Sequence, residues 1–287
     1  MIDYKLKTFL KLYDTMNYRA AASALNLTQP AVTQHIHALE NEYGCSLFHY
    51  DGRRLHRTAA AEKLAVYARS MLYNEQRFLQ EVGRLPAQPL RIGATKSIGN
   101  YVIGGMLAKA LEDPETTLTL TVDNTRALLA QLQRGELDFA LIEGHFDKQV
   151  YGHCLLRHEL FVGVCAREHP LAGAEADLEM MFGETLLLRE PGSGTRVILE
   201  EALQALGYTT ERFRRTVGVS SAPVICDLAA RGAGISFVYE AVAKSSPLLA
   251  TFTIRGMPIV REFNYVYLKG TAAEDIVARF RALERWL

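Results

Sequence analysis

The spacing of hydrophobic residues changes twice along the chain and divides it into three blocks. In residues 1–58, apolar positions recur at helical spacing in short segments that end in a basic, glycine-containing loop. Residues 59–84 keep one long helical pattern, which two prolines within the hinge at 85–89 stop. From residue 90 to 287, short apolar runs alternate with helical patterns. This alternation predicts an α/β domain with largely parallel sheets.

The expected elements of the C-terminal block follow from these runs. Strands are predicted at 90–94, 118–122, 138–142, 160–166, 185–189 and 235–239. Helices are predicted at 99–111, 125–134, 195–206, 222–232 and 272–286. No apolar run reaches the roughly 18–20 residues of a membrane span, and the charged start argues against a signal peptide. We therefore expect a cytoplasmic protein that does not contact membranes.

The N-terminal block predicts a helix-turn-helix followed by a hairpin. After a first helix with an apolar stripe, a short helix at 19–25 and a turn lead to a helix at 28–44. Thr28 is suited to cap this helix, Pro30 fits its first turn, and Gly44 suits its end. Its polar face would present Gln29, Thr33, Gln34 and His37.

These polar residues suit DNA. Glutamine can pair with adenine through two hydrogen bonds, and threonine can contact base edges or a thymine methyl group. The hairpin at 49–58 would form a wing whose Arg53, Arg54 and Arg57 suit phosphates or the minor groove. Taken alone, the same residues also fit a small helical bundle with a solvated basic loop.

Charge supports a nucleic-acid-binding head only weakly. The whole chain has no net charge, with 32 Lys and Arg against 32 Asp and Glu. Residues 1–89, however, contain 11 basic and 8 acidic residues, and the remainder contains 21 and 24. A modestly basic head on a mildly acidic body fits a DNA-binding module joined to a second domain.

The run RAAASALNLTQPAVTQHIHALENEYGCSLFHYDGRRLHRT (19–58) closely resembles the winged helix-turn-helix of LysR-type transcriptional regulators. The match extends over about forty residues in order and spacing. The resemblance implies that Thr28, Gln29, Pro30, Thr33 and Gln34 lie at the DNA and that Arg53 and Arg54 contact its backbone. Gln34 departs from the basic residue usual in the family, which weakens a phosphate contact or alters base preference. His37 is a further candidate on the same helix.

The helix expected at 59–84 is long enough to need a partner. A heptad-like seam of apolar residues with one charged member runs along it, formed by Leu64, Ala68, Met71, Glu75, Phe78 and Val82. Packing on its own domain is the alternative. The resemblance implies a homodimer formed through this linker helix, and a homotetramer beyond it. Two recognition helices would then read a pseudo-palindromic operator in double-stranded DNA, with RNA polymerase as a further partner.

In the C-terminal block, hydroxyl, amide and basic side chains follow the predicted strands. Because ligands of open α/β sheets bind beyond the carboxyl ends of strands, such residues suit a small anion at helix N-termini. Each Ser or Thr taken singly is also an ordinary helix cap. Candidate effector-binding residues are Thr95, Lys96, Ser97, Asn124, Ser193, Thr195, Arg196 and Ser221. Glu143 and His145 lie near them, and Glu143 would repel an anion, so a zwitterion is the alternative ligand.

The resemblance extends to the effector-binding domain of the family, which has a periplasmic-binding-protein-like fold of two subdomains. Subdomain I would comprise 90–165 and 269–287, and subdomain II would comprise 168–264. The crossovers are expected near 166–168 and 265–269, with the effector in the cleft between the subdomains.

Enzyme motifs are absent or incomplete. GVSSA at 218–222 approaches a nucleophile elbow, but no histidine follows His169 to complete a serine triad. The four scattered cysteines form no CxxC pair, and the spacing of the histidines does not indicate a metal site. We therefore expect no catalytic residue, metal or cofactor. The predicted function is transcription regulation under a small-molecule effector; the alternative is a ligand-binding or catalytic α/β domain with an incidental helical head.

Overall fold

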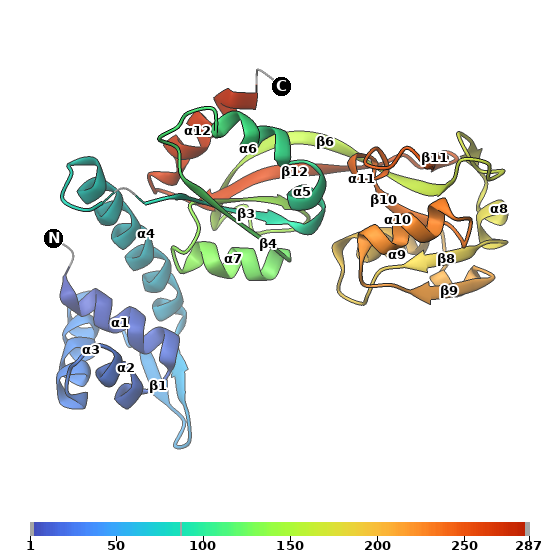
Figure 1. Ribbon diagram of the computed structural model, residues 1–287. Helices are drawn as coiled ribbons and strands as arrows, with labels where there is room; N and C mark the ends of the chain where they lie inside the picture. Colours follow the sequence, from blue (N-terminus) through green and yellow to red (C-terminus); the bar gives the residue numbers. More distant parts are fainter. Residues whose placement is uncertain (1–2, 87, 285–287) are drawn as a thin grey trace.

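The computed structural model describes residues 3–86 and 88–284. Figure 1 shows a small helical unit at the N-terminal end, the long helix α4 (Ala59–Glu81) leading away from it, and an α/β domain of two lobes. The long strands β6 (Tyr151–Ala166) and β12 (Ile259–Leu268) run through both lobes and join them. The predicted architecture of a winged helix-turn-helix followed by a two-subdomain α/β domain is confirmed. Within the described ranges, no helix has both the length and the apolar composition needed to cross a bilayer.

The N-terminal unit packs three helices and a hairpin around one core. The Asn17 side chain caps α2, the Thr28 side chain caps α3, and Gly44 ends α3 with a φ of 64°. The elements are α1 (Tyr4–Thr15), α2 (Tyr18–Ala24), α3 (Gln29–Tyr43), β1 (Phe48–Tyr50) and β2 (Leu55–Arg57). The core includes Phe9, Leu12, Val32, Ile36 and Leu39, all nearly inaccessible to solvent. The inward face of α3 is therefore fully used for packing, which leaves its polar face outward.

Helix α4 begins inside this core, and that divides the predicted heptad seam. Leu64 and Ala68 are buried among α1 and the other elements of the N-terminal unit. Farther along, Phe78 is 59% exposed, and Val82, directly after the end of the helix, is 49% exposed. Because the first half of the seam packs within its own domain, only the second half is open to a partner.

The first lobe, subdomain I, is built on parallel strands. Strand β3 lies between β4 and β5 and pairs in parallel with both. Its strands are β3 (Leu90–Thr95), β4 (Leu118–Asp123) and β5 (Phe139–Glu143). Its helices are α5 (Lys96–Tyr101), α6 (Gly104–Ala110), α7 (Thr125–Gln133) and α12 (Ala273–Glu284). The single helix expected at 99–111 is wrong: the backbone leaves helical geometry at Val102, whose φ is −120°, and α6 starts anew.

The second lobe, subdomain II, combines a short parallel pair with strands laid on β6. Strands β8 (Thr185–Leu188) and β9 (Arg215–Gly218) are parallel, whereas β10 (Ser236–Tyr239) and β11 (Leu249–Ile254) are antiparallel to β6. The remaining elements are β7 (Glu175–Ala176), α8 (Leu178–Phe182), α9 (Gly194–Ala205), the 3-10 turn at Thr210–Arg212, α10 (Ala222–Ala230) and α11 (Glu240–Ala243).

The crossovers lie earlier than the sequence suggested. Residues 161–164 of β6 already pair with β10 in the second lobe, so the outward crossing precedes 166–168. Residues 263–266 of β12 pair with β5 in the first lobe, so the return is complete before 265–269. Both crossing strands are antiparallel to each other along their length. Long strands carry the chain between lobes here, whereas the sequence analysis looked for short linking segments and mainly parallel sheets.

Candidate DNA-binding and effector-binding sites

The outward face of α3 gathers the polar residues predicted to meet DNA. Gln29, Pro30, Thr33, Gln34 and His37 line one shallow surface hollow. Only Thr33 is partly buried; the other four are exposed. The sequence folds this way because the apolar residues of α3 take the opposite face of the helix.

Hydrogen bonds within the unit distinguish these side chains. The Thr28 hydroxyl accepts from Ala31 N at 3.3 Å, so its role in the structure is that of a helix cap. Thr33 donates to the Gln29 carbonyl at 3.1 Å, and His37 lies 3.2 Å from the Glu40 carboxylate. Within residues 3–86 and 88–284, no partner is found for the carboxamides of Gln29 and Gln34. The carboxamides of these two side chains therefore keep their donors and acceptors open to an outside partner.

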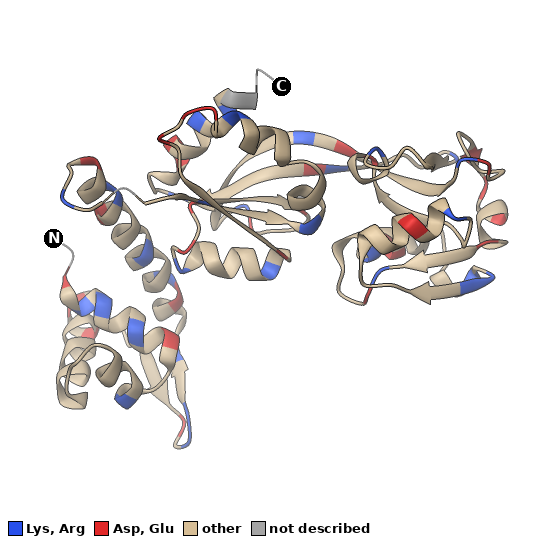
Figure 2. Ribbon diagram, in the orientation of Figure 1, with Lys and Arg blue, Asp and Glu red and all other residues tan. Residues whose placement is uncertain are grey.

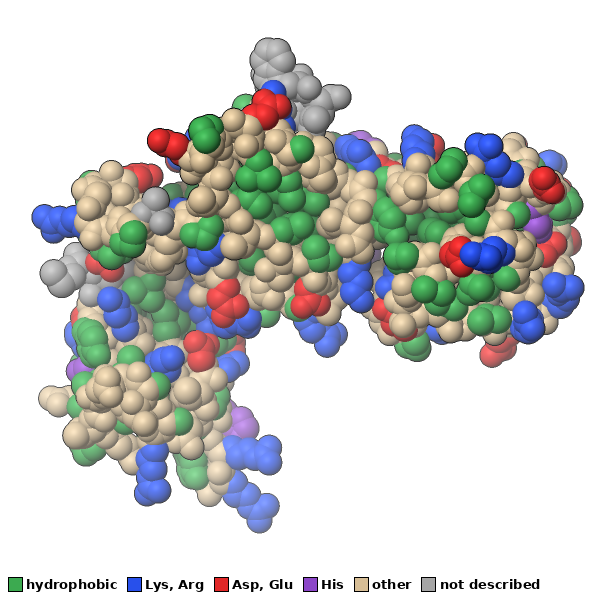
Figure 3. All heavy atoms as spheres, in the orientation of Figure 1, with side chains coloured by type: hydrophobic (Ala, Val, Ile, Leu, Met, Phe, Trp, Pro, Cys, Tyr) green, Lys and Arg blue, Asp and Glu red, His purple; other side chains and the backbone are tan. Residues whose placement is uncertain are grey.

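The wing, residues 48–57, is organised by Asp51. Its carboxylate accepts from the backbone N–H groups of Arg54 at 2.7 Å and Arg53 at 2.8 Å, and it lies 2.7 Å from His56 Nε2. These contacts lower the pKa of Asp51 to about 2. The turn thus projects the exposed Arg53 and Arg54 outward, and neither forms an ion pair among the described residues. Figure 2 marks basic residues along the ribbon at this end of the N-terminal unit, and Figure 3 shows basic side chains there, away from the α/β domain.

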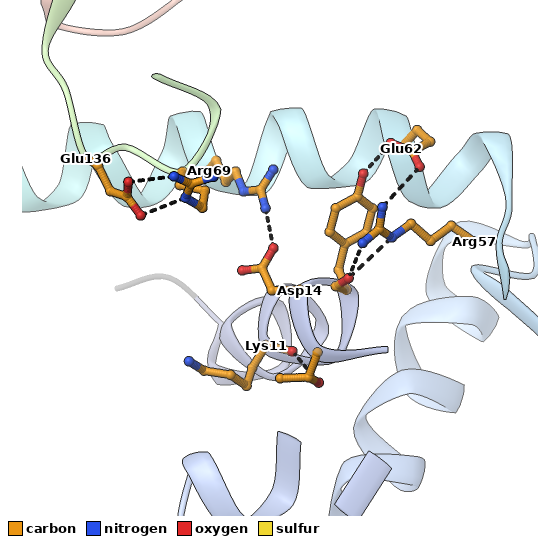
Figure 4. A network of polar contacts seen from close by, with 9 residues as sticks. Lys11, Asp14, Arg57, Glu62, Arg69 and Glu136 are labelled. Atoms are coloured by element: carbon orange, nitrogen blue, oxygen red, sulfur yellow. Dashed lines mark hydrogen bonds and ion pairs between the residues drawn. The ribbon is translucent and has the colours of Figure 1, made fainter. Parts of the chain in front are cut away.

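Arg57 does not join them. Its guanidinium donates to the Tyr13 carbonyl at 2.8 Å and lies 4.0 Å from the centre of the Tyr13 ring. Figure 4 shows Arg57 turned toward α1 and toward Glu62 of α4. The Arg57 guanidinium is thus engaged within its own unit while the side chain stays 36% exposed, and its contact with DNA stays a prediction.

Replacing Arg53 or Arg54 by alanine is expected to weaken DNA binding to a similar extent on all sequences. Each loss removes one phosphate contact, so the slope of log affinity against log salt should fall by about one. Binding titrations over a salt series measure this slope. Arg231→Ala, on an exposed residue of the second lobe, is the matched control. An unchanged slope in both wing variants would remove the wing from the interface.

The polar groups predicted around β3 converge on Glu143 rather than on open space. Thr95 is buried, and its hydroxyl donates to the Glu143 carboxylate. The Ser97 hydroxyl and the backbone N–H of Ile98, both in α5, also bond to that carboxylate. The chain's own carboxylate therefore occupies the donors that the sequence analysis reserved for an anion.

The two predicted basic residues are already paired. Lys96 Nζ, in the first lobe, lies 3.8 Å from Glu190 in the second lobe. Arg196 donates from Nε to Glu200 at 2.7 Å and from Nη1 to the Arg189 carbonyl at 3.2 Å. The Lys96 contact spans the two lobes, whereas Arg196 is held within the second lobe.

The remaining predicted residues lie at helix starts. Asn124 caps α7 by accepting from Ala127 N at 3.0 Å. Ser193 and Thr195 contact each other at 3.1 Å through their hydroxyls at the start of α9. Ser221 precedes α10 without a capping hydrogen bond from its side chain. The structure therefore brings Thr95 and Ser97 together, and it groups Ser193 with Thr195 separately.

A cavity of about 440 Å³ lies between the lobes, which is a volume suited to a small ligand. The eight predicted effector residues are not among the described residues that line it, although Thr125 and Gly194, next to Asn124 and Ser193, are. Its lining comprises Thr125, Glu143, Gly144, His145, Phe146, Lys148, Gly194, Val197, Ile198, Glu201, Tyr239, Val260, Arg261, Glu262 and Asn264.

Tyr239 and Asn264 were missed by sequence reasoning. Tyr239 stands at the carboxyl end of β10, a position that the strand-end rule covers but that was not searched. Asn264 lies on β12, a strand that the apolar pattern did not reveal. Over the described ranges, no group of three or more His, Cys, Asp or Glu side chains is arranged to hold a metal ion.

Comparison with known families fits both parts of this geometry. Residues 4–62 match the family described as bacterial regulatory helix-turn-helix protein, lysR family. Residues 83–285 match the LysR substrate binding domain. The chain belongs to the LysR family. Members of this family are transcriptional regulators rather than enzymes, which agrees with the sequence analysis.

Relatives of this LysR-family chain align over nearly its whole length. The HTH-type transcriptional regulator CysL of Bacillus subtilis (strain 168) is 26% identical, covering 91% of this chain and 89% of that protein. The RuBisCO operon transcriptional regulator of Acidithiobacillus ferrooxidans is 30% identical, covering 99% and 92%. The solved structure of full-length LysG from Corynebacterium glutamicum with bound effector Arg has a TM-score of 0.69 at 19% identity, covering 98% of each chain.

In this LysR-family chain, Glu143 is expected to make stability depend on pH. Burial raises the pKa of Glu143 to about 7, although the hydrogen bonds from Thr95, Ser97 and Ile98 act in the opposite direction and lower it. Because the folded-state pKa lies above the ordinary 4.5, the stabilising contribution is complete below pH 4.5 and is lost as pH rises through 7. Glu143→Gln should therefore melt higher than the wild type above pH 7, and this advantage should shrink at acid pH.

Melting curves of the ligand-free protein across this range test the pH dependence. Glu112→Gln, which removes an exposed carboxylate paired with Lys109, serves as the control and should give a nearly constant difference. A Glu143→Gln advantage that grows toward acid pH would contradict the assignment.

Proposed function

We propose that the chain is a transcription regulator that binds a pseudo-palindromic operator and responds to a small molecule held between the two subdomains. The observation that carries this proposal is the outward face of α3, where the exposed carboxamides of Gln29 and Gln34 have no partner among the described residues. The exposed Arg53 and Arg54 of the wing likewise form no ion pair within the described ranges. This face matches the needs of major-groove reading and phosphate contact.

DNA binding as a homodimer is part of the proposal. The second half of α4 leaves Phe78 and Val82 exposed, beyond the part that packs in the N-terminal unit. Pairing of two such helices would cover these side chains and set two copies of α3 on successive half-sites. We also propose a homotetramer and contact with RNA polymerase, both on the basis of the family resemblance. A protein that binds chromosomal DNA in this way would act in the cytoplasm.

For the DNA-binding residues we propose Thr28, Gln29, Pro30, Thr33, Gln34, His37, Arg53 and Arg54. For the effector, the cavity beside Glu143 supports a small organic molecule, and a zwitterion suits it better than a simple anion. Thr95 and Ser97 would act through Glu143, and Lys96 through its contact with Glu190. Asn124, Ser193, Thr195, Arg196 and Ser221 would shape the helix starts around the cleft.

Selection of bound fragments from the source genome, followed by footprinting at about 0.15 M salt, tests the function. A protected region with two related half-sites is the expected result. Weak binding that ignores sequence and disappears with added salt would overturn the proposal, because phosphate contacts alone produce that behaviour.

A further inference from the structure

The cavity between the lobes contains a carboxylate that its surroundings do not neutralise. Thr95, Ser97 and the backbone of α5 approach Glu143 from one side, and all are neutral donors. On its other side Glu143 borders the cavity and is only partly buried there. No ion pair to Glu143 is found within the described residues.

The other charges around the cavity are matched with one another. Lys148 Nζ lies 3.3 Å from Glu262, whose carboxylate also accepts from Asn264. Arg261 lies 4.0 Å from Glu201. Among the lining residues described, the charged side chains other than Glu143 thus form two pairs, and the cavity retains one uncompensated acidic group.

A second polar group in the cavity has no partner. The Tyr239 side chain is fully buried, yet its hydroxyl makes no hydrogen bond to any described residue. Tyr239 lines the same cavity as Glu143, and the Glu143 charge raises the pKa of that phenol further above the value that burial alone gives. A buried hydroxyl without a partner is costly, and a ligand can satisfy it.

We propose that this cavity takes a ligand bearing an ammonium or guanidinium group, which pairs with the Glu143 carboxylate while a further polar atom of the ligand bonds to the Tyr239 hydroxyl. The inference rests on the proposed effector site and deepens it. A cation next to the carboxylate replaces the water lost on burial, and charge-assisted hydrogen bonds of this kind are the strong ones. An anion placed there would face Glu143 directly, and both basic side chains of the lining are already engaged.

Calorimetric titration of the full-length protein with named compounds tests this inference. L-Lysine, L-arginine and putrescine are the cationic probes, and succinate and glutarate are the anionic ones. 1,4-Butanediol matches putrescine in length but carries neutral hydroxyl groups in place of both ammonium groups. We expect at least one cationic probe to bind at millimolar concentration or below, 1,4-butanediol to bind at least about tenfold more weakly than putrescine, and the dicarboxylates not to bind.

Two variants connect binding to the residues. Glu143→Gln should weaken the bound amine by about tenfold or more, because a neutral amide replaces the charged acceptor. Tyr239→Phe should weaken it severalfold without lowering the melting temperature, because it removes a hydroxyl that has no partner in the free protein. Glu112→Gln is the matched control and should bind like the wild type.

Three results would overturn the inference: preference of the wild type for dicarboxylates, unchanged amine affinity in Glu143→Gln, or no binding by any amine of the panel. If Glu143→Gln does not fold, Tyr239→Phe and the comparison of putrescine with 1,4-butanediol still decide. Footprinting without added ligand is recorded in parallel. Intact operator binding together with a preference for dicarboxylates would overturn this inference alone. Absent operator binding would overturn the proposed function.

Discussion

Asp138→Asn is expected to lower the free energy of unfolding of the α/β domain by about 3 kcal/mol and to release helix α4 from it. Asp138 precedes β5 and is fully buried. Its carboxylate accepts from the Tyr73 hydroxyl at 2.9 Å and forms ion pairs with Arg77 at 2.6 Å and Arg91 at 2.7 Å. Tyr73 and Arg77 belong to α4, whereas Arg91 belongs to β3. One carboxylate therefore fixes the linker helix to the first lobe.

The size of the effect follows from what the substitution leaves behind. Removing one partner of a buried pair costs about 3–5 kcal/mol, because the remaining charge stays buried without compensation. The side chains of Arg77 and Arg91 are 17% and 21% exposed, so both can be partly solvated by water. The loss of unfolding free energy should therefore lie near the lower end of this range. For a domain of this size, about 3 kcal/mol corresponds to roughly 6–12 °C in melting temperature.

Lowering the pH should destabilise the α/β domain, as the Asp138→Asn substitution does. Burial by itself raises the pKa of Asp138, but the hydrogen bonds from Arg91 and Arg77 outweigh it and hold the pKa below the ordinary 3.8. A depressed pKa gives stability that is complete above 3.8 and is lost as pH falls through the folded-state value. The acid-induced loss should therefore be smaller in Asp138→Asn than in the wild type.

Calorimetry measures the loss of stability, and limited proteolysis of the linker measures the release of α4. Tyr73→Phe removes the hydrogen bond to Asp138 and a longer one from Arg77 Nε at 3.4 Å, and it should cost only about 1–2 kcal/mol. Asp227→Asn breaks an exposed pair with Arg231 and should cost at most about 0.5 kcal/mol. A melting temperature of Asp138→Asn within about one degree of the wild type, with a linker no more open to protease, would show that Asp138 does not hold α4.

Gln29→Ala is the second large effect that we expect, and it concerns DNA. Gln29 opens α3, is exposed, and its carboxamide has no partner among the described residues. A side chain that pairs with a base through two hydrogen bonds contributes about 1–3 kcal/mol to discrimination, or roughly 5- to 150-fold in affinity. The loss should fall on the specific operator and spare binding to unrelated DNA.

Competition titrations on operator and unrelated fragments at one salt concentration separate sequence-specific binding from general DNA binding. Gln204→Ala, an exposed glutamine of α9 in the second lobe, is the matched control. Equal losses on both fragments would mean that Gln29 acts through general affinity. An unchanged operator affinity would place base recognition elsewhere on the surface.

The sequence predicted the N-terminal unit well because its signals are local. Thr28 precedes the start of α3 and Gly44 follows its end, as expected. Helix capping and a left-handed residue at the C-terminal end depend on only a few neighbouring residues. The apolar positions of α3 face inward for the same reason, so the polar face could be assigned in advance. The contacts of Arg57 could not be predicted in the same way, because its partner Tyr13 lies 44 positions away in the chain.

The effector region shows the opposite behaviour. Strand-end residues such as Thr95 and Ser97 were found from the pattern, but their partner Glu143 decides their role, and the sequence recorded Glu143 only as a caution. Tyr239 and Asn264 reach the cavity through strands β10 and β12. The position of β12 beside β6 depends on pairing between residues about a hundred positions apart.

By itself, the sequence determined a helical head that ends in a basic loop, a long linker helix and an α/β domain, because periodicity, caps and breakers act over short distances. The resemblance to LysR-type regulators identified the head as a winged helix-turn-helix and the α/β domain as an effector-binding domain. Only the tertiary structure decided which half of α4 stays open and which carboxylate anchors it. It also decided that Glu143 fills the predicted anion position and leaves a cavity with an unbalanced charge. Those features arise from long-range packing and the burial of charge, which no local pattern of residues records.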